Sequence, residues 1–254
     1  MIALIFALSA FAQELADPAH VRREISGGVW VDWTDLAIEV TTDARGHGTQ
    51  DIEAVEQQAR REVDAAMGQG ARRVLLNRQT TVGDLEEDQR LWQALASRLS
   101  RWEIEEGRYT DEGEVTLTAT LDLQDLLKPY TLSQARPAPV ADARAGAWTG
   151  LVIDARGTGL EPCWAPAVVT AEAREVMVVR MWEDDAVNSA PLVYVSDPAH
   201  PFAARAGLHP LFVRAAAADG ASIVLGGEDL RRLEAELAGS TAFGQGRVVI
   251  VVDP

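Results

Sequence analysis

The stretch TGLVIDARGTGLEPCWAPAVV, residues Thr149–Val169, decides how the second half of the chain is expected to fold. Its run Gly150–Ile153 is apolar and contains β-branched side chains, which is typical of a buried strand. Gly157 and Gly159 follow and allow the positive φ angles of a tight reversal, while two prolines further on prevent a helix from forming there. The stretch therefore predicts a strand that ends in a glycine turn.

Asp154 and Arg156 lie between the strand and the turn, two positions apart, so that both side chains leave an extended chain on the same face. Together with Gly157 and Gly159 they form a candidate ligand or ion-pair site, with a carboxylate, a guanidinium group and free backbone N–H groups. The alternative is an Asp–Arg pair that only fixes the turn, since exposed pairs of this kind are common. A nucleotide loop is excluded, because the third glycine and the following helix are both missing.

Composition limits the remaining chemistry. The chain has 254 residues, enough for two modest domains, and its formal net charge of -16 argues against nucleic acid or anionic lipid as a partner. Cys163 is the only cysteine, which excludes an intramolecular disulfide and a zinc-binding cysteine cluster. A nucleophilic role would need a histidine partner, but the four histidines are scattered, so a buried thiol is favoured. We predict no catalytic residues, no metal ligands and no cofactor.

The N-terminus reads MIALIFALSAFA and ends in the small-residue pattern Ala10-Phe11-Ala12. This pattern is typical of a secretory signal cleaved after Ala12, and we assign residues 1–16 to the signal region. The apolar run is shorter than the ~20 residues that a membrane-spanning helix needs. No basic residue precedes the run, so a buried N-terminal helix or strand is the alternative. No cysteine ends the run, so we expect no lipid anchor there and a periplasmic or otherwise exported protein.

Residues 20–130 are expected to form an α+β domain with helices packed on one face of an antiparallel sheet. Alternating and helical apolar patterns predict the elements, in chain order: one or two strands in Val29–Ala44, a helix over Ile52–Met67 ended by Gly68 and Gly70, a strand in Arg72–Val82, a helix over Leu85–Arg101, and a hairpin of Trp102–Tyr109 with Glu114–Leu123.

Residues 131–147 are rich in proline and alanine and are predicted to be a linker, followed by a mixed α/β unit over residues 148–254. Besides the opening stretch, this unit is expected to contain strands at Glu175–Met181 and Pro191–Val195, a short helix in Pro198–Ala206, a strand pair of Leu211–Ala217 with Ala221–Leu225 around Asp219-Gly220, a helix over Glu228–Leu237, and a central strand at Arg247–Val252. The fold class is therefore α+β with two small domains.

Several of these segments resemble the FlgP-like family of flagellar outer-membrane lipoproteins and their secreted relatives. The resemblance lies in TGLVIDARGTGLEPCWAPAV, VYV, LFVRAAA, SIVLGGEDLRRL and GRVVIVVD, and in the N-terminal QARREVDAA and EGEVTLTATLDL segments. It implies an envelope protein of Gram-negative bacteria without enzyme activity, and flagellar members build disk-like assemblies around the motor. The chain departs from the lipoprotein pattern because it has no lipobox cysteine.

The sequence leaves three functional hypotheses. The first is a non-enzymatic periplasmic or envelope structural or assembly protein, with flagellar association as one form, which acts through protein partners or self-association. The alternative is a periplasmic binding module for a glycan or peptide, which uses the Asp154–Arg156 strand end and the tryptophans Trp148, Trp164 and Trp182. The third is a hydrolase, although no pair of carboxylates is marked by its spacing.

Overall fold

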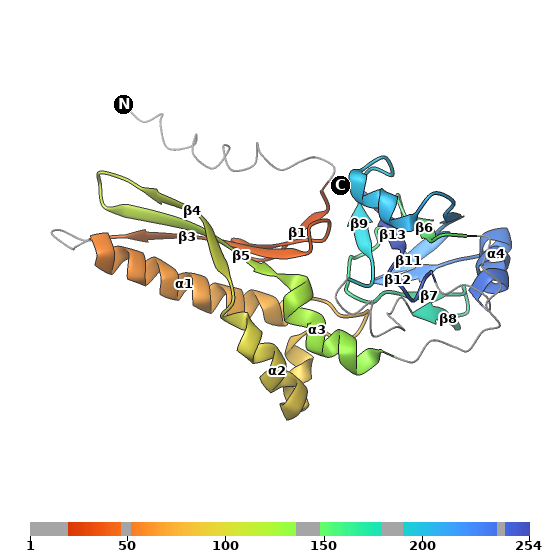
Figure 1. The fold of residues 1–254 in the computed structure, drawn as a ribbon, viewed down its shortest axis with the longest axis horizontal. Helices are drawn as coiled ribbons and strands as arrows, with labels where there is room; N and C mark the ends of the chain where they lie inside the picture. Colours follow the sequence, from red (N-terminus) through yellow and green to blue (C-terminus); the bar gives the residue numbers. More distant parts are fainter. Residues whose placement is uncertain (1–19, 47–51, 136–147, 179–189, 238–241) are drawn as a thin grey trace.

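The structure is a computed structural model that describes residues 20–46, 52–135, 148–178, 190–237 and 242–254. It confirms the α+β fold class, with an N-terminal antiparallel sheet and helices followed by a unit with two further sheets (Figure 1). The predicted signal region, residues 1–16, and residues 136–147 of the predicted linker lie outside the described residues.

The N-terminal sheet has the strand order β1-β2-β3-β5-β4. Its strands are β1 (Arg22–Ser26), β2 (Val29–Asp32), β3 (Ala37–Arg45), β4 (Glu103–Tyr109) and β5 (Glu114–Asp122). The central pair β3–β5 stays in register from Ala37 opposite Asp122 to Arg45 opposite Glu114, and every second side chain of β5 is buried. The strands predicted in Val29–Ala44 and the predicted hairpin are confirmed; β1 was not predicted, because Ile25 is its only apolar residue.

Helix α1 (Ile52–Arg73) runs along one face of this sheet (Figure 1). Its buried side chains recur at the predicted helical spacing. The prediction that Gly68 and Gly70 end the helix is wrong. A Cβ atom on Gly70 would lie 2.5 Å from Cγ1 of Val29, so this glycine lets the helix backbone approach the sheet closely.

The segment after α1 is not the predicted strand. Arg72 and Arg73 form the last turn of the helix, and only an isolated bridge joins Leu75 to Thr81. A short 3-10 helix, η1 (Gly83–Glu87), then leads to α2 (Gln89–Leu99), which lies within the predicted helical range. Asp88 caps α2, because its carboxylate accepts the N–H of Leu91 at 3.0 Å.

Helix α3 (Leu123–Gln134) was not predicted, and its last turn occupies the first residues of the predicted linker. Asp122 caps it by accepting the N–H of Asp125 at 2.9 Å. Pro129 lies inside the helix and cannot donate to the carbonyl of Asp125, but Nη1 of Arg98 donates to that carbonyl at 3.1 Å. A side chain of α2 therefore replaces the hydrogen bond that the proline removes.

The C-terminal unit contains a parallel sheet of order β10-β6-β13-β9 and a mixed sheet of order β11-β12-β7-β8. The parallel strands are β6 (Leu151–Asp154), β9 (Val193–Val195), β10 (Leu211–Arg214) and β13 (Val248–Val251). The others are β7 (Ala167–Val169), β8 (Glu175–Val178), β11 (Ala217–Asp219) and β12 (Ser222–Val224). All four residues of β13 are buried, as predicted for a central strand.

Two elements of this unit differ from their predictions. The Asp219-Gly220 hairpin forms between β11 and β12, but the predicted partner strand Leu211–Ala217 divides into two. Ala215 N–H donates to the Asp154 carbonyl in one sheet and Ala216 N–H donates to the Val224 carbonyl in the other, so the chain crosses between sheets there.

The remaining elements of this unit are the 3-10 helix η3 (Pro201–Ala206) and α4 (Gly227–Leu237), both close to their predicted ranges. β8 lies within the predicted strand Glu175–Met181, of which residues 179–181 lie outside the described residues.

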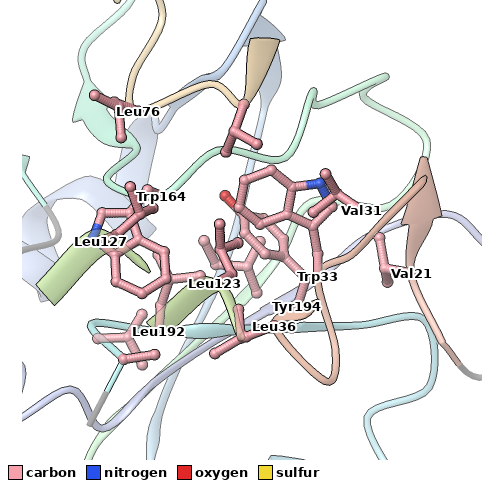
Figure 2. Close-up of a cluster of buried hydrophobic side chains, with 14 of the residues drawn as sticks. Val21, Val31, Trp33, Leu36, Leu76, Leu123, Leu127, Trp164, Leu192 and Tyr194 are labelled. Atoms are coloured by element: carbon pink, nitrogen blue, oxygen red, sulfur yellow. The ribbon is translucent and has the colours of Figure 1, made fainter. Parts of the chain in front are cut away.

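The two units share one hydrophobic core (Figure 2). The ring of Trp33 in the first unit meets the ring of Tyr194 in the second edge-on, with centroids 5.7 Å apart. The N–H groups of Trp164 and Ala165 donate to the carbonyls of Leu75 and Leu76 at 2.9 and 2.8 Å. Among the helices of the described segments, none is both long and apolar enough to cross a bilayer.

Candidate functional site

The candidate site lies where the parallel strands β6, β10 and β13 end. Carboxyl ends of parallel strands are the usual place for a ligand in an open α/β sheet. Arg214 of β10 and Val251 of β13 both lie opposite Asp154, the last residue of β6. Arg156 follows Asp154 and Asp253 follows Val251, each two positions later, so the topology gathers charged groups from three segments.

Asp154 and Arg156 form the pair that their spacing predicts. Nε of Arg156 donates to Oδ1 of Asp154 at 2.8 Å and Nη2 donates to Oδ2 at 2.7 Å, a bidentate geometry. The hydrogen bonds from Arg156 are the main cause that lowers the pKa of Asp154 below its ordinary value. The pKa of Arg156 is raised, first by the hydrogen bond to Asp154 and also by the charges of Asp197 and Asp253. Asp154 is therefore an ionised carboxylate at neutral pH and is unsuited to donate a proton.

The backbone N–H of Gly157 in the glycine turn is already bonded to a side chain of the same chain. Gly157 and Gly159 have φ angles of 74° and 69°, the left-handed conformation that the sequence predicts. The Gly157 N–H donates to both carboxylate oxygens of Asp253, at 3.2 and 2.9 Å. A carboxylate of this chain thus occupies the position at which an anionic ligand would accept a hydrogen bond. The geometry favours the turn-fixing role of the Asp154–Arg156 pair.

Cys163 is fully buried, and its burial raises the pKa of the thiol to about 12. The hydroxyl of Tyr194 donates to the Cys163 carbonyl at 2.9 Å and accepts the Cys163 N–H at 3.0 Å. The thiol is protonated at neutral pH, so it has the packing role that the sequence favours and lacks the thiolate that a nucleophile needs.

A cavity of about 380 Å³ lies at the junction of the two units. Its lining includes Tyr130 and Gln134 from α3 and Trp164 and Glu175 from the second unit. Nε1 of Trp164 donates to Oγ1 of Thr131 at 3.1 Å, so this tryptophan is held in the core. Of the two other tryptophans in the ligand hypothesis, Trp148 is half-buried against the same core and Trp182 lies outside the described residues.

The structure also brings together His20, Asp32 and Asp35, which sequence reasoning did not select. Nδ1 of His20 lies 2.9 Å from Oδ2 of Asp32 and 3.4 Å from Oδ2 of Asp35. Asp32 ends β2 and Asp35 lies in the turn between β2 and β3, whereas His20 lies just before β1. Only the pairing of β1 with β2 connects them, and β1 carries no recognisable strand pattern.

Part of the chain is similar to a known protein family. Residues 150–254 match a family model described as Treponema pallidum Tp0624, second domain. The match spans the C-terminal unit, including Asp154, Arg156 and both turn glycines. No curated protein matches the chain. The resemblance to the FlgP-like family stays a prediction.

Proposed function

We propose that the protein is a non-enzymatic structural or assembly protein of the bacterial cell envelope, which acts through contacts with other protein chains. The observation that supports this most is the exposed edge strand β4. It pairs with β5 on one side, it is the last strand in its sheet, and its side chains are exposed at six of seven positions. Such an edge offers unpaired backbone groups to a strand from another chain.

The backbone of β4 shows which groups face outward. The Thr110 N–H donates to the Glu114 carbonyl at 3.0 Å. Because hydrogen-bonded and non-bonded pairs alternate in an antiparallel ladder, the Arg108 N–H faces β5, whereas the N–H groups of Gly107 and Tyr109 face away. The tip of this hairpin lies at the end of the molecule opposite the C-terminal unit (Figure 1). A second chain can therefore reach this edge without meeting the second unit.

The charges on β4 limit which strand it accepts. The strand carries Glu103, Glu105, Glu106 and Arg108. Charged side chains protect an edge strand against indiscriminate pairing, and opposite charges across a strand pair are favourable. A strand with basic side chains fits this edge best, and in a second copy of the chain β1, the opposite edge of the same sheet, carries Arg22 and Arg23.

Light scattering on gel-filtered protein tests the proposal. We expect the wild-type chain to assemble, and Tyr109→Pro to reduce assembly because it removes an outward N–H. Tyr109→Ala is the matched control: it also removes the ring, whose hydroxyl donates to Glu56 at 3.1 Å, but it keeps the N–H. A wild-type chain that stays monomeric, or a proline variant that assembles like wild type, contradicts the proposal.

The proposed compartment is the periplasm, in line with the signal-like N-terminus, and a flagellar association is the narrower form of the proposal. Expression in a Gram-negative host followed by N-terminal sequencing tests the compartment. We expect a periplasmic product that begins at Gln13. An uncleaved product in the cytoplasm contradicts it.

The junction cavity favours a second candidate function, the binding of a small glycan or peptide. A volume of about 380 Å³ with aromatic and polar lining residues is typical of a ligand pocket. A thermal-shift screen would test this, with two variants to locate a ligand. Glu175→Gln should reduce the shift for a ligand in the cavity, whereas Asp154→Ala should reduce it for a ligand at the strand end.

A further inference from the structure

The cluster of His20, Asp32 and Asp35 has the geometry of a metal site. A first-row ion binds imidazole nitrogen and carboxylate oxygen at about 2.0–2.2 Å, so two ligand atoms on one ion lie roughly 2.9–3.5 Å apart. The separations from Nδ1 of His20 to the two carboxylate oxygens, 2.9 and 3.4 Å, fall in this range. All three ligand atoms lie within 4.8 Å of one another.

The turn fixes the direction of the Asp32 carboxylate. Asp32 is only 2% exposed, and its Oδ1 accepts the N–H groups of Thr34 and Asp35 at 2.8 and 2.9 Å. Its other oxygen, Oδ2, therefore faces His20. A carboxylate held in this way needs little reorganisation to bind an ion.

The surrounding charges favour a cation. Nε of Arg22 lies 4.0 Å from Oδ2 of Asp32, but the guanidinium group of Arg22 forms an ion pair with Glu39. The pKa of Glu39 is raised, mainly by burial and also by the negative charges of Asp32, Glu105 and Asp35, although Arg22 opposes the shift. The carboxylates of Asp32, Asp35 and Glu39 therefore outnumber the guanidinium groups of Arg22 and Arg205 near the cluster.

Two further features point to solvent beside the cluster. Nε of Arg22 is a buried nitrogen without a hydrogen-bond acceptor among the described residues, and a water molecule next to Oδ2 of Asp32 would supply one. A cavity of about 280 Å³, lined by Asp35, Phe202 and Arg205 among others, lies beside the cluster and leaves room for such solvent.

We propose that His20, Asp32 and Asp35 bind a divalent transition-metal ion of the Zn²⁺ class. One imidazole and two carboxylates suit Zn²⁺, Mn²⁺ or Co²⁺, whereas Mg²⁺ and Ca²⁺ prefer oxygen ligands alone. Three protein ligands leave at least one position for water.

The ion would join the start of β1 to the β2–β3 turn, beside the C-terminal unit. The ring of His200 from that unit meets the ring of His20 edge-on, with centroids 5.5 Å apart, and Oγ1 of Thr34 donates to the Tyr194 carbonyl at 2.8 Å. Metal binding would therefore stabilise the junction of the two units. This inference is independent of the proposed assembly function.

Isothermal titration with Zn²⁺ tests the site on the full chain, after treatment with EDTA and in buffer with excess Mg²⁺. We expect one ion per chain and a higher melting temperature with Zn²⁺. Asp35→Asn and His20→Gln should each weaken binding by at least about tenfold, since even indirect changes around a metal site have effects of this size. The side chain of Asp35 is 50% exposed, so its variant should fold. Asp111→Asn and His209→Gln, at exposed positions outside the cluster, should bind like wild type.

Circular dichroism of the metal-free variants shows whether they are folded before Zn²⁺ is added. No saturable binding by the wild-type chain, or wild-type affinity in both cluster variants, would overturn the proposal and leave an ion pair of His20 and Asp32 only.

Discussion

Asp32 ends β2 in the N-terminal unit and Asp154 ends β6 in the C-terminal unit, but the two carboxylates have opposite surroundings. Asp154 pairs with Arg156, two residues further on, and both side chains stay partly exposed. Asp32 is buried and binds His20, twelve residues earlier, as well as the N–H groups of its own turn. The short spacing of Asp154 and Arg156 thus gives a local ion pair that can be recognised in the sequence. The contact of Asp32 with His20 depends on strand pairing, and we expect it to contribute more to stability.

The largest expected effect is on Asp32. Asp32→Ala removes an acceptor from the buried Thr34 N–H, from the partly buried Asp35 N–H and from His20, so it should lower the free energy of unfolding by about 3 kcal/mol or more. Urea denaturation followed by circular dichroism measures this change. If Asp32→Ala lowered the free energy of unfolding by no more than the loss of an exposed ion pair, Asp32 and Asp154 would not differ in their contribution to stability.

The next largest effect is on Thr34, which links the Asp32 turn to the second unit. Its hydroxyl accepts the Val21 N–H at 2.9 Å and donates to the Tyr194 carbonyl at 2.8 Å. Thr34→Val keeps the shape of the side chain and should cost about 1–3 kcal/mol, since it leaves buried backbone groups unsatisfied. Thr116→Val is the control: Thr116 is half-buried, its hydroxyl donates to Asp43 in an exposed hydrogen bond, and the substitution should change stability by less than about 0.5 kcal/mol. Equal effects of the two substitutions would contradict the role of Thr34.

A smaller effect is expected at Asp154. Asp154→Ala should reduce the free energy of unfolding by less than about 1 kcal/mol, because its pair with Arg156 is local and partly exposed. The same urea titration applies. A loss comparable to that of Asp32→Ala would show that the strand end is more than a fixed turn.

The smallest effect concerns pH. The pKa of folded Asp154 lies below its ordinary value of 3.8, mainly because Arg156 donates hydrogen bonds to it. Its contribution is therefore present above pH 3.8 and is lost as the pH falls through the folded pKa. Asp154→Asn should lose stability less steeply over that acid range than wild type, in melting temperatures measured at successive pH values. An unchanged slope would show that the hydrogen bonds to Asp154 contribute nothing in solution.

The sequence predicted the elements that have a strong local pattern. The alternation in β5 and the continuous apolar run of β13 gave their positions and their burial, and the spacing of Asp154 and Arg156 gave the pair. These features depend on neighbouring residues alone, so they can be predicted without knowledge of the fold.

The wrong and missing predictions depend on distant contacts. Gly70 looks like a helix terminator, but it lies where the helix meets Val29 of the sheet. Pro129 argues against α3, but Arg98 from another helix binds the carbonyl that the proline leaves free. His20 shows no pattern with Asp32 until β1 pairs with β2. In each case the partner is far away in the sequence, and local spacing holds no information about it.

The backbone hydrogen bonds between the units have a mechanical consequence. Trp164 and Ala165 donate to the neighbouring carbonyls of Leu75 and Leu76, so the two bonds lie side by side. A force that pulls the units apart would load both bonds at once and would have to extract the Trp164 ring from the core in the same step. We therefore expect the two hydrogen bonds to break together. Single-molecule pulling from the two units should show this as one abrupt rupture event.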